Sequence, residues 1–492
     1  MDFFIDLLKV ISKKKLQNIE ILDKTLLSNK DSLYSKFYHG ILEDLIKDDN
    51  DAVVFLYGDD SETSLNNYRQ FKYRFKKRIL NTLFFLDLSN KEYNTKIQKD
   101  YFEGIKSIYE VDIIQKFGGN NSLVHKIITD NYNIAKKYKF YNILAEYSNK
   151  LINYYTLEAN YNQVQKEKEK YIKYSNLTKE ENLAFILFNE VNILTSDDKP
   201  NTKLIQKKQA EVDTVIKNSE SELTKIYAYM TIILLDELSL NYDSGINNCH
   251  NVLNLLSKRD FLIKQSYTSL VNYFIIRMKY QQRDFYNCEI LIEQIKDKMF
   301  GLNWFMANEI RFKIALNNKE FKLAKHIYNG VVGHNLYNSL PSKYKEVWQI
   351  YNYSLQLYQS IIDNTEFANN IYTLINDCPT VFHDKSGFNF SLILLKIMYF
   401  INKQKLDEAS QTIGTLRVYS SRYFKTKKHA RNKVLINALI KLEKNNFESQ
   451  INPFLNIKDP NEDILLDAEI IHYENLLSAI NLMHQHNNTQ KQ

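Results

Sequence analysis

One phrase of sequence recurs through the C-terminal half of the chain and constrains its fold more than any other feature. In each copy, polar residues precede an aromatic residue or leucine, and a helical pattern of apolar residues follows. The anchoring residues are Tyr242, Phe285, Phe321, Phe367, Leu406 and Phe447, at separations of 43, 36, 46, 39 and 41 residues. The residue three positions later is small in four of the six copies, namely Gly245, Cys288, Ala324 and Ala409. A small residue lets two helix backbones approach closely, so each phrase indicates the start of the second helix of a pair.

Apolar stretches with helical periodicity lie between the copies and predict the first helix of each pair. They cover residues 224–238, 263–279, 303–316, 344–361 and 388–402. Tyr161 begins an earlier unit, and residues 203–218 suggest another whose anchor is missing. The sequence therefore predicts helical hairpins repeated along the chain.

The composition agrees with a helical chain. Glycine and proline together contribute only 11 and 5 of the 492 residues, whereas turn-rich sheet folds need many of both. The predicted fold class is all-α.

This pattern resembles the tetratricopeptide-repeat (TPR) and TPR-like family of α-solenoids. The resemblance is carried best by Phe321 with Ala324 and by Leu406 with Ala409, and it covers about residues 121–458. The units average 41 residues, against ~34 in a TPR, and the Trp-x₂-Leu-Gly signature is missing. Longer helices and irregular units are therefore expected. The resemblance implies a superhelix that binds a protein or peptide on its concave face.

Three regions are expected. Residues 1–117 form an N-terminal helical domain or cap, ending at Gly118-Gly119; residues 121–458 form the repeat array; and residues 459–492 form a C-terminal capping helix and polar tail. The last helix is predicted from Asp459-Pro460-Asn461-Glu462, which offers an acidic N-cap followed by proline and glutamate. Capping boxes are also predicted at Ser89 with Glu92, Thr178 with Glu181 and Ser219 with Glu222.

No motif for catalysis is found. The chain lacks a phosphate-binding glycine loop, a dinucleotide fingerprint, a zinc-protease motif and a nucleophile elbow. We therefore expect a protein that is not an enzyme, with no catalytic residue, no cofactor and no metal site. An enzyme whose residues converge from distant positions stays open as a further alternative.

Cysteine usage and the N-terminus suggest a cytoplasmic protein. Cys249, Cys288 and Cys378 are odd in number and far apart, which favours a reducing compartment. No apolar run approaches the ~18 residues of a spanning helix, and the N-terminal lysines follow the apolar part instead of preceding it, unlike a signal peptide. No membrane partner is expected.

The candidate binding residues lie in two basic segments. The first lies on a predicted helix, and the second spans a predicted helix end. The apolar face predicted for the first helix consists of Tyr68, Phe71, Phe75, Ile79, Leu83 and Leu86. The basic residues are Arg69, Lys72, Arg74, Lys76, Lys77 and Arg78, and Arg417, Arg422, Lys425, Lys427, Lys428 and Arg431. Arginine favours bidentate contact with carboxylate or phosphate. Three interpretations stay open: these residues form a solvated or intramolecularly paired face, they bind an acidic protein, or they bind nucleic acid. In the first interpretation, the acidic stretch 43–60 is one possible partner of segment 69–78.

The leading functional hypothesis is a scaffold or adaptor that binds a protein or peptide on the first-helix face of the array, with the basic segments as anchors. The alternative is a nucleic-acid-binding or peptide-sensing regulator that uses segments 69–78 and 417–433. The sequence does not indicate an oligomeric state.

Overall fold

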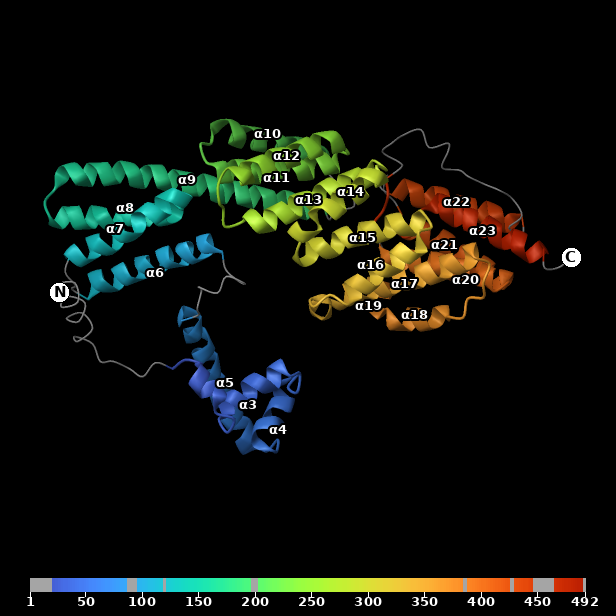
Figure 1. Cartoon of the computed structure of the whole chain (residues 1–492), viewed down its shortest axis with the longest axis horizontal. Helices are drawn as coiled ribbons and strands as arrows, with labels where there is room; N and C mark the ends of the chain where they lie inside the picture. The colour runs from blue at the N-terminus through green and yellow to red at the C-terminus, as the bar shows by residue number, and fades with distance from the viewer. Residues whose placement is uncertain are drawn as a thin grey trace. The chain divides into compact units, whose positions relative to one another are not determined.

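A computed structural model describes residues 20–85, 95–117, 121–195, 202–383, 387–424, 429–445 and 464–489. Within these residues the chain is all-α and contains no strand, as the sequence predicts (Figure 1). The chain forms two compact units, one up to residue 176 and one from residue 177, and the division falls inside α9 (Tyr161–Leu194). Among the described helices, none combines the length and the apolarity that crossing a bilayer requires.

The first unit contains two separate hydrophobic clusters, one on each side of residues 86–94. In the N-terminal cluster, Tyr68, Phe71 and Phe75 are buried, as predicted for the apolar face of this helix. Ile79 and Leu83 of the same predicted face are exposed, so that part of the prediction is wrong, and Leu86 lies outside the described residues. Phe37 packs edge-on against Phe75, with 4.9 Å between ring centroids. The elements before α9 are α2 (Lys24–Ser28), α3 (Leu33–Leu42), α4 (Asp49–Tyr57), α5 (Glu62–Thr82), η1 (Leu83–Phe85), α6 (Lys96–Lys116), α7 (Asn121–Tyr138) and α8 (Tyr141–Leu157).

The second unit is a solenoid of helical hairpins in which consecutive helices pack against each other. The first helices of its pairs are α11 (Glu222–Leu238), α13 (Lys264–Gln281), α15 (Gly301–Asn317), α17 (Ser342–Ile362), α20 (Phe388–Asn402) and α22 (Ala430–Lys444). The second helices are α12 (Tyr242–Lys258), α14 (Phe285–Ile295), α16 (Phe321–Val332) and α21 (Leu406–Tyr423). The remaining elements are α10 (Thr202–Asn218), η2 (Lys296–Lys298), η3 (Tyr337–Ser339), α18 (Ile371–Asp377), α19 (Pro379–His383) and α23 (Tyr473–Thr489).

Four copies of the recurrent phrase begin a second helix at the anchoring residue. Helices α12, α14, α16 and α21 start at Tyr242, Phe285, Phe321 and Leu406. The small residues three positions later are buried. At Gly245 the packing is so close that a Cβ atom would lie 2.6 Å from the Sδ of Met278. The sequence predicts that the small residue allows close approach within a pair, but this tight contact is with α13 of the next pair, whereas the Cβ of Asp236 on α11 would lie 3.4 Å from the added Cβ atom.

The copy at Phe367 differs, and the copy at Phe447 lies outside the described residues. Phe367 is buried in a non-helical stretch, residues 365–370, which follows α17. The next helix begins only at Ile371, where the Asn370 side chain accepts a hydrogen bond from the Tyr372 N–H. Because proline cannot continue a helix, Pro379 divides the following residues into the two short helices α18 and α19.

The turns inside the hairpins explain how the chain forms tight connections with so little glycine. Leu240, Arg283, Lys319 and Gln404 adopt φ angles of 57 to 63°, each two residues before a second helix. In the turn at Lys319, the N–H of Glu320 donates to the carbonyl of Ala315 at 2.8 Å, the six-to-one bond of a Schellman motif. Glycine usually occupies this left-handed position. Here the packing of the two helices holds other residues in the left-handed conformation.

Three helix-start predictions are wrong where the structure describes them. Thr178 lies inside the continuous helix α9 and caps nothing. Helix α11 is capped by Ser221 instead of Ser219, and both hydroxyls donate to carboxylates of α9, Ser219 to Glu180 and Ser221 to Glu181. Residues 464–472, predicted to continue a helix from Asp459-Pro460, are not helical, and α23 begins only at Tyr473. Asp459-Pro460 itself, like the pair Ser89 and Glu92, lies outside the described residues.

Candidate functional site

A non-helical segment near the C-terminus lies against the first helices of the array. We call residues 464–472 the strap. The strap contains a turn in which the N–H of Glu469 donates to the carbonyl of Leu466 at 2.9 Å. Its polar contacts come from α13, α15, α20 and α22, all of which are first helices.

The N-terminal half of the strap is held mainly through its main chain. The side-chain amide of Gln281 on α13 makes two bonds to Leu465, donating from Nε2 to the carbonyl at 2.8 Å and accepting from the N–H at 3.1 Å. Lys313 on α15 donates to the carbonyl of Asp467, and Ser391 on α20 donates to the carbonyl of Ala468. Main-chain bonds of this kind bind a polypeptide whatever its side chains are.

The C-terminal half is clamped by Asn317, the last residue of α15. Its Nδ2 donates to the carbonyl of Ile470 at 3.0 Å, and its Oδ1 accepts from the N–H of His472 at 2.7 Å. The His472 Nε2 lies 3.1 Å from the Tyr280 hydroxyl on α13. Burial lowers the pKa of His472 to about 3, opposed by the charge of Glu474, so the ring is neutral in the folded protein.

A buried ion pair fixes the middle of the strap. The Arg431 guanidinium on α22 donates to both carboxylate oxygens of Glu469, at 2.6 and 3.1 Å, and it also donates to Glu474 at 2.8 Å. The side chains of Arg431 and Glu469 are both 0% exposed. Burial raises the pKa of Glu469, and the Arg431 charge opposes that rise. The pair therefore joins the middle of the strap to α22.

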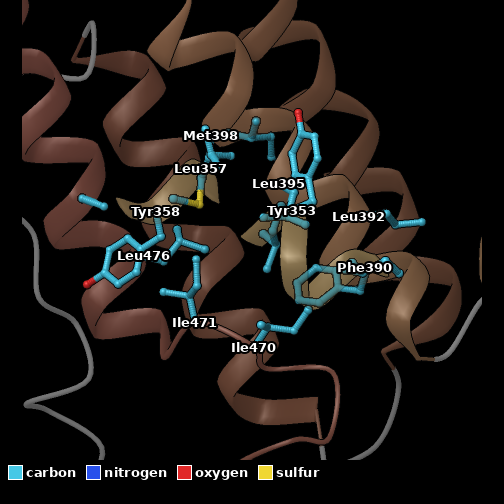
Figure 2. Packing of buried hydrophobic residues seen from close by; sticks show 14 of the residues in the cluster. Tyr353, Leu357, Tyr358, Phe390, Leu392, Leu395, Met398, Ile470, Ile471 and Leu476 are labelled. Atoms are coloured by element: carbon cyan, nitrogen blue, oxygen red, sulfur yellow. The ribbon is translucent and has the colours of Figure 1, made fainter. Parts of the chain in front are cut away.

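Apolar side chains of the strap complete the hydrophobic core. Ile470 and Ile471 belong to the same buried cluster as Tyr358 of α17 and Phe390 of α20 (Figure 2). Leu465 joins the neighbouring cluster, which is built mainly from α11 to α15.

A cavity of about 240 Å³ lies beside Asp467 of the strap. Its charged lining comprises Arg277 of α13, Glu309 and Lys313 of α15, Lys343 of α17 and Asp467 itself. The Arg277 side chain also lies 2.7 Å from Glu237, and Lys313 lies 3.0 Å from Glu309. The first-helix face thus presents cations next to an acidic strap residue.

The first predicted basic segment lies on α5, and much of it pairs within its own unit. Lys72 forms an ion pair with Asp49 of the acidic stretch at 2.5 Å. Lys77 lies 3.4 Å from Glu20, and the Arg78 guanidinium lies 4.6 Å from the ring centre of Tyr34. Arg69 contacts Asn66 and Arg74 contacts the Gln70 carbonyl, while Lys76 is exposed.

The second predicted basic segment is not one surface. Arg417 and Arg422 are exposed on α21, and Lys425, Lys427 and Lys428 lie outside the described residues. The prediction of Arg431 as a surface anchor is wrong, because its charge is buried and neutralised by Glu469 and Glu474.

Sequence reasoning did not find the residues that hold the strap. Gln281, Lys313 and Asn317 each end or interrupt an apolar helix, and a polar residue at such a position is the one signal that could have indicated them. Their partners lie more than 150 residues away in sequence, so no local pattern connects them.

Within the described ranges, no three His, Cys, Asp or Glu side chains gather as a metal site. The three cysteines are free and buried in the helical packing. Burial raises the pKa of Cys288 and of Cys378 to about 12 and that of Cys249 further, so all three stay as thiols at neutral pH.

No family model, no curated protein and no solved structure matches this chain.

Proposed function

We propose that this protein is a non-enzymatic scaffold or adaptor whose TPR-like array binds a protein or peptide segment on its first-helix face. One observation carries the proposal: first helices hold the non-helical strap by side-chain hydrogen bonds to its main chain, at Leu465, Asp467, Ala468 and Ile470. A surface that binds one irregular segment of polypeptide in this way has the chemistry to bind another.

The charged groups around the cavity add selectivity to this binding mode. Arg277, Lys313 and Lys343 line it together with Glu309 and Asp467, so an incoming segment meets both signs of charge. Complementary charges select among partners more than they add affinity. The proposal places the protein in the cytoplasm, supported by the three free cysteines.

We do not extend the proposal to nucleic acid. Lys72, Lys77 and Arg78 of segment 69–78 contact groups of their own unit, and Arg431 of segment 417–433 is buried. These contacts reduce the positive charge available to phosphates.

A charge reversal on the first-helix face tests the proposal. The full-length protein is used to select binders from a displayed library of short random peptides. Lys343→Glu changes the cavity rim on α17, whereas Lys322→Glu makes the same change at an exposed position of the second helix α16. We expect the selected peptides to bind Lys343→Glu about tenfold more weakly than wild type and to bind Lys322→Glu unchanged. Equal binding to both variants, or no enriched peptide, would overturn the proposal.

A further inference from the structure

The strap has two halves of different character, and this difference carries an inference that rests on the proposed function. Residues 469–472 are buried throughout, whereas Ile464, Leu466 and Ala468 are half-buried and Asp467 is exposed. The buried half is held by the Arg431 ion pair and the Asn317 clamp. In the N-terminal half, the main chain is bound by Gln281, Lys313 and Ser391, and the one charged side chain, Asp467, lies at the charged cavity.

The N-terminal half of the strap also shows which side chains this surface accepts. Leu465 is 2% exposed and packs in the cluster with residues of α13 and α15. Two positions later, Asp467 lines the cavity with Arg277, Lys313 and Lys343. The surface therefore accommodates an aliphatic side chain, one half-buried residue, and then a carboxylate.

We propose that residues 464–468 are a built-in competitor for the partner site. The partner is a peptide segment with an aliphatic residue two positions before an acidic residue, and it binds by displacing this half of the strap. The Gln281 amide would then pair with the main chain of the partner, and the cavity would receive its carboxylate.

The connection to Glu469 makes the competition strong. Residues 464–468 are joined directly to the anchored half, so they reach the site at a high effective concentration. A free peptide binds only the fraction of molecules whose strap is open, which weakens its apparent affinity by that fraction. A substitution in the strap raises the fraction of open molecules and leaves the array unchanged. Such a substitution should therefore tighten binding of the peptide.

The test uses the full-length protein and a fluorescein-labelled synthetic peptide with the sequence of residues 461–468, NEDILLDA. Leu465→Ala weakens the strap by removing its buried side chain. Leu466→Ala is the matched control, because it shortens the half-buried neighbour and leaves the Leu465 contacts in place. Asp467→Asn is a second strap variant. Because the Asp467 side chain is exposed, this substitution leaves no cavity in the hydrophobic core.

We expect Leu465→Ala to bind the peptide about tenfold or more tightly than wild type, with Asp467→Asn changed in the same direction and Leu466→Ala within about twofold of wild type. Adding Gln281→Leu to Leu465→Ala should abolish the gain. A peptide with lysine in place of its final aspartate should not bind. In the wild type, added peptide should speed hydrogen exchange at the Leu465 amide, which Gln281 protects.

Equal peptide affinity in wild type and both strap variants would overturn the inference. If library peptides still bound in a manner that depends on Lys343, the proposed function would stand and only the displacement of the strap would fall. If no peptide bound any form, both would fall. Should Leu465→Ala fail to fold, Asp467→Asn alone decides the result.

Discussion

The Arg431 guanidinium donates two hydrogen bonds to the carboxylate of Glu469, 38 residues further along the chain, and neither side chain reaches solvent. Two buried charges lose their hydration, and each is stabilised here by the opposite charge of the other. This pair joins α22 to the strap, four residues before α23 begins at Tyr473.

Removing one partner of this pair should be costly. Arg431→Met leaves the Glu469 carboxylate buried without its cation, and we expect the free energy of unfolding to fall by about 3–5 kcal/mol. Replacing both residues, by Arg431→Met with Glu469→Leu, should restore part of that loss, because no fully buried charge then remains uncompensated, whereas the part-exposed Glu474 still loses its contact with Arg431. Urea unfolding followed by circular dichroism measures both values. A double variant no more stable than Arg431→Met would contradict this account.

His472 should make stability depend on pH in the acidic range. Burial lowers its pKa from 6.5 to about 3. At a pH between these two values, the His472 ring is mostly protonated in the unfolded chain and mostly neutral in the folded protein. The free energy of unfolding should therefore fall as the pH drops below 6.5, by up to about 1.4 kcal/mol for each pH unit from this group.

The variant His472→Gln isolates this contribution, since glutamine does not titrate and can still accept a hydrogen bond from Tyr280. Urea midpoints measured at a series of pH values should fall less steeply for His472→Gln than for wild type. Parallel pH profiles would show that His472 is not responsible.

The left-handed turn residues offer a stabilising substitution. Lys319 has a φ of 63°, which a side chain disfavours and glycine adopts freely. We expect Lys319→Gly to raise the free energy of unfolding by about 0.5–1 kcal/mol. His326→Gly, at an exposed interior position of the adjacent helix α16, should lower it by about 0.3–0.5 kcal/mol. If thermal unfolding shows the same loss for both variants, the turn is not strained.

The cysteines should resist alkylation in the folded protein. Each is buried, and the raised pKa values leave almost no thiolate at neutral pH. Mass spectrometry after iodoacetamide treatment should find Cys249, Cys288 and Cys378 unmodified, and all three modified in urea. Fast labelling of one cysteine under native conditions would mean that its part of the array opens readily.

Much of the array could be predicted because its signals are local. Periodic apolar residues mark the first helices, and an anchor with a small residue three positions later marks α12, α14, α16 and α21 at Tyr242, Phe285, Phe321 and Leu406. The scarcity of glycine excluded turn-rich sheet folds. It did not reveal the turns themselves, which use residues such as Lys319 in a left-handed conformation.

The sequence by itself thus determined the helical class and where most helix pairs begin, since these depend on neighbours within a few turns of helix. Only the tertiary structure decided that residues 464–472 are not helical and that Arg431 is buried. The strap has a helical apolar pattern, but helix propensity differs by less than about 1 kcal/mol per residue. Buried bonds from Gln281 and Asn317, together with the Arg431 ion pair, outweigh it. Those partners lie far from the strap in sequence, 184 residues for Gln281 and 153 for Asn317, so no local stretch of sequence shows that they override helix formation.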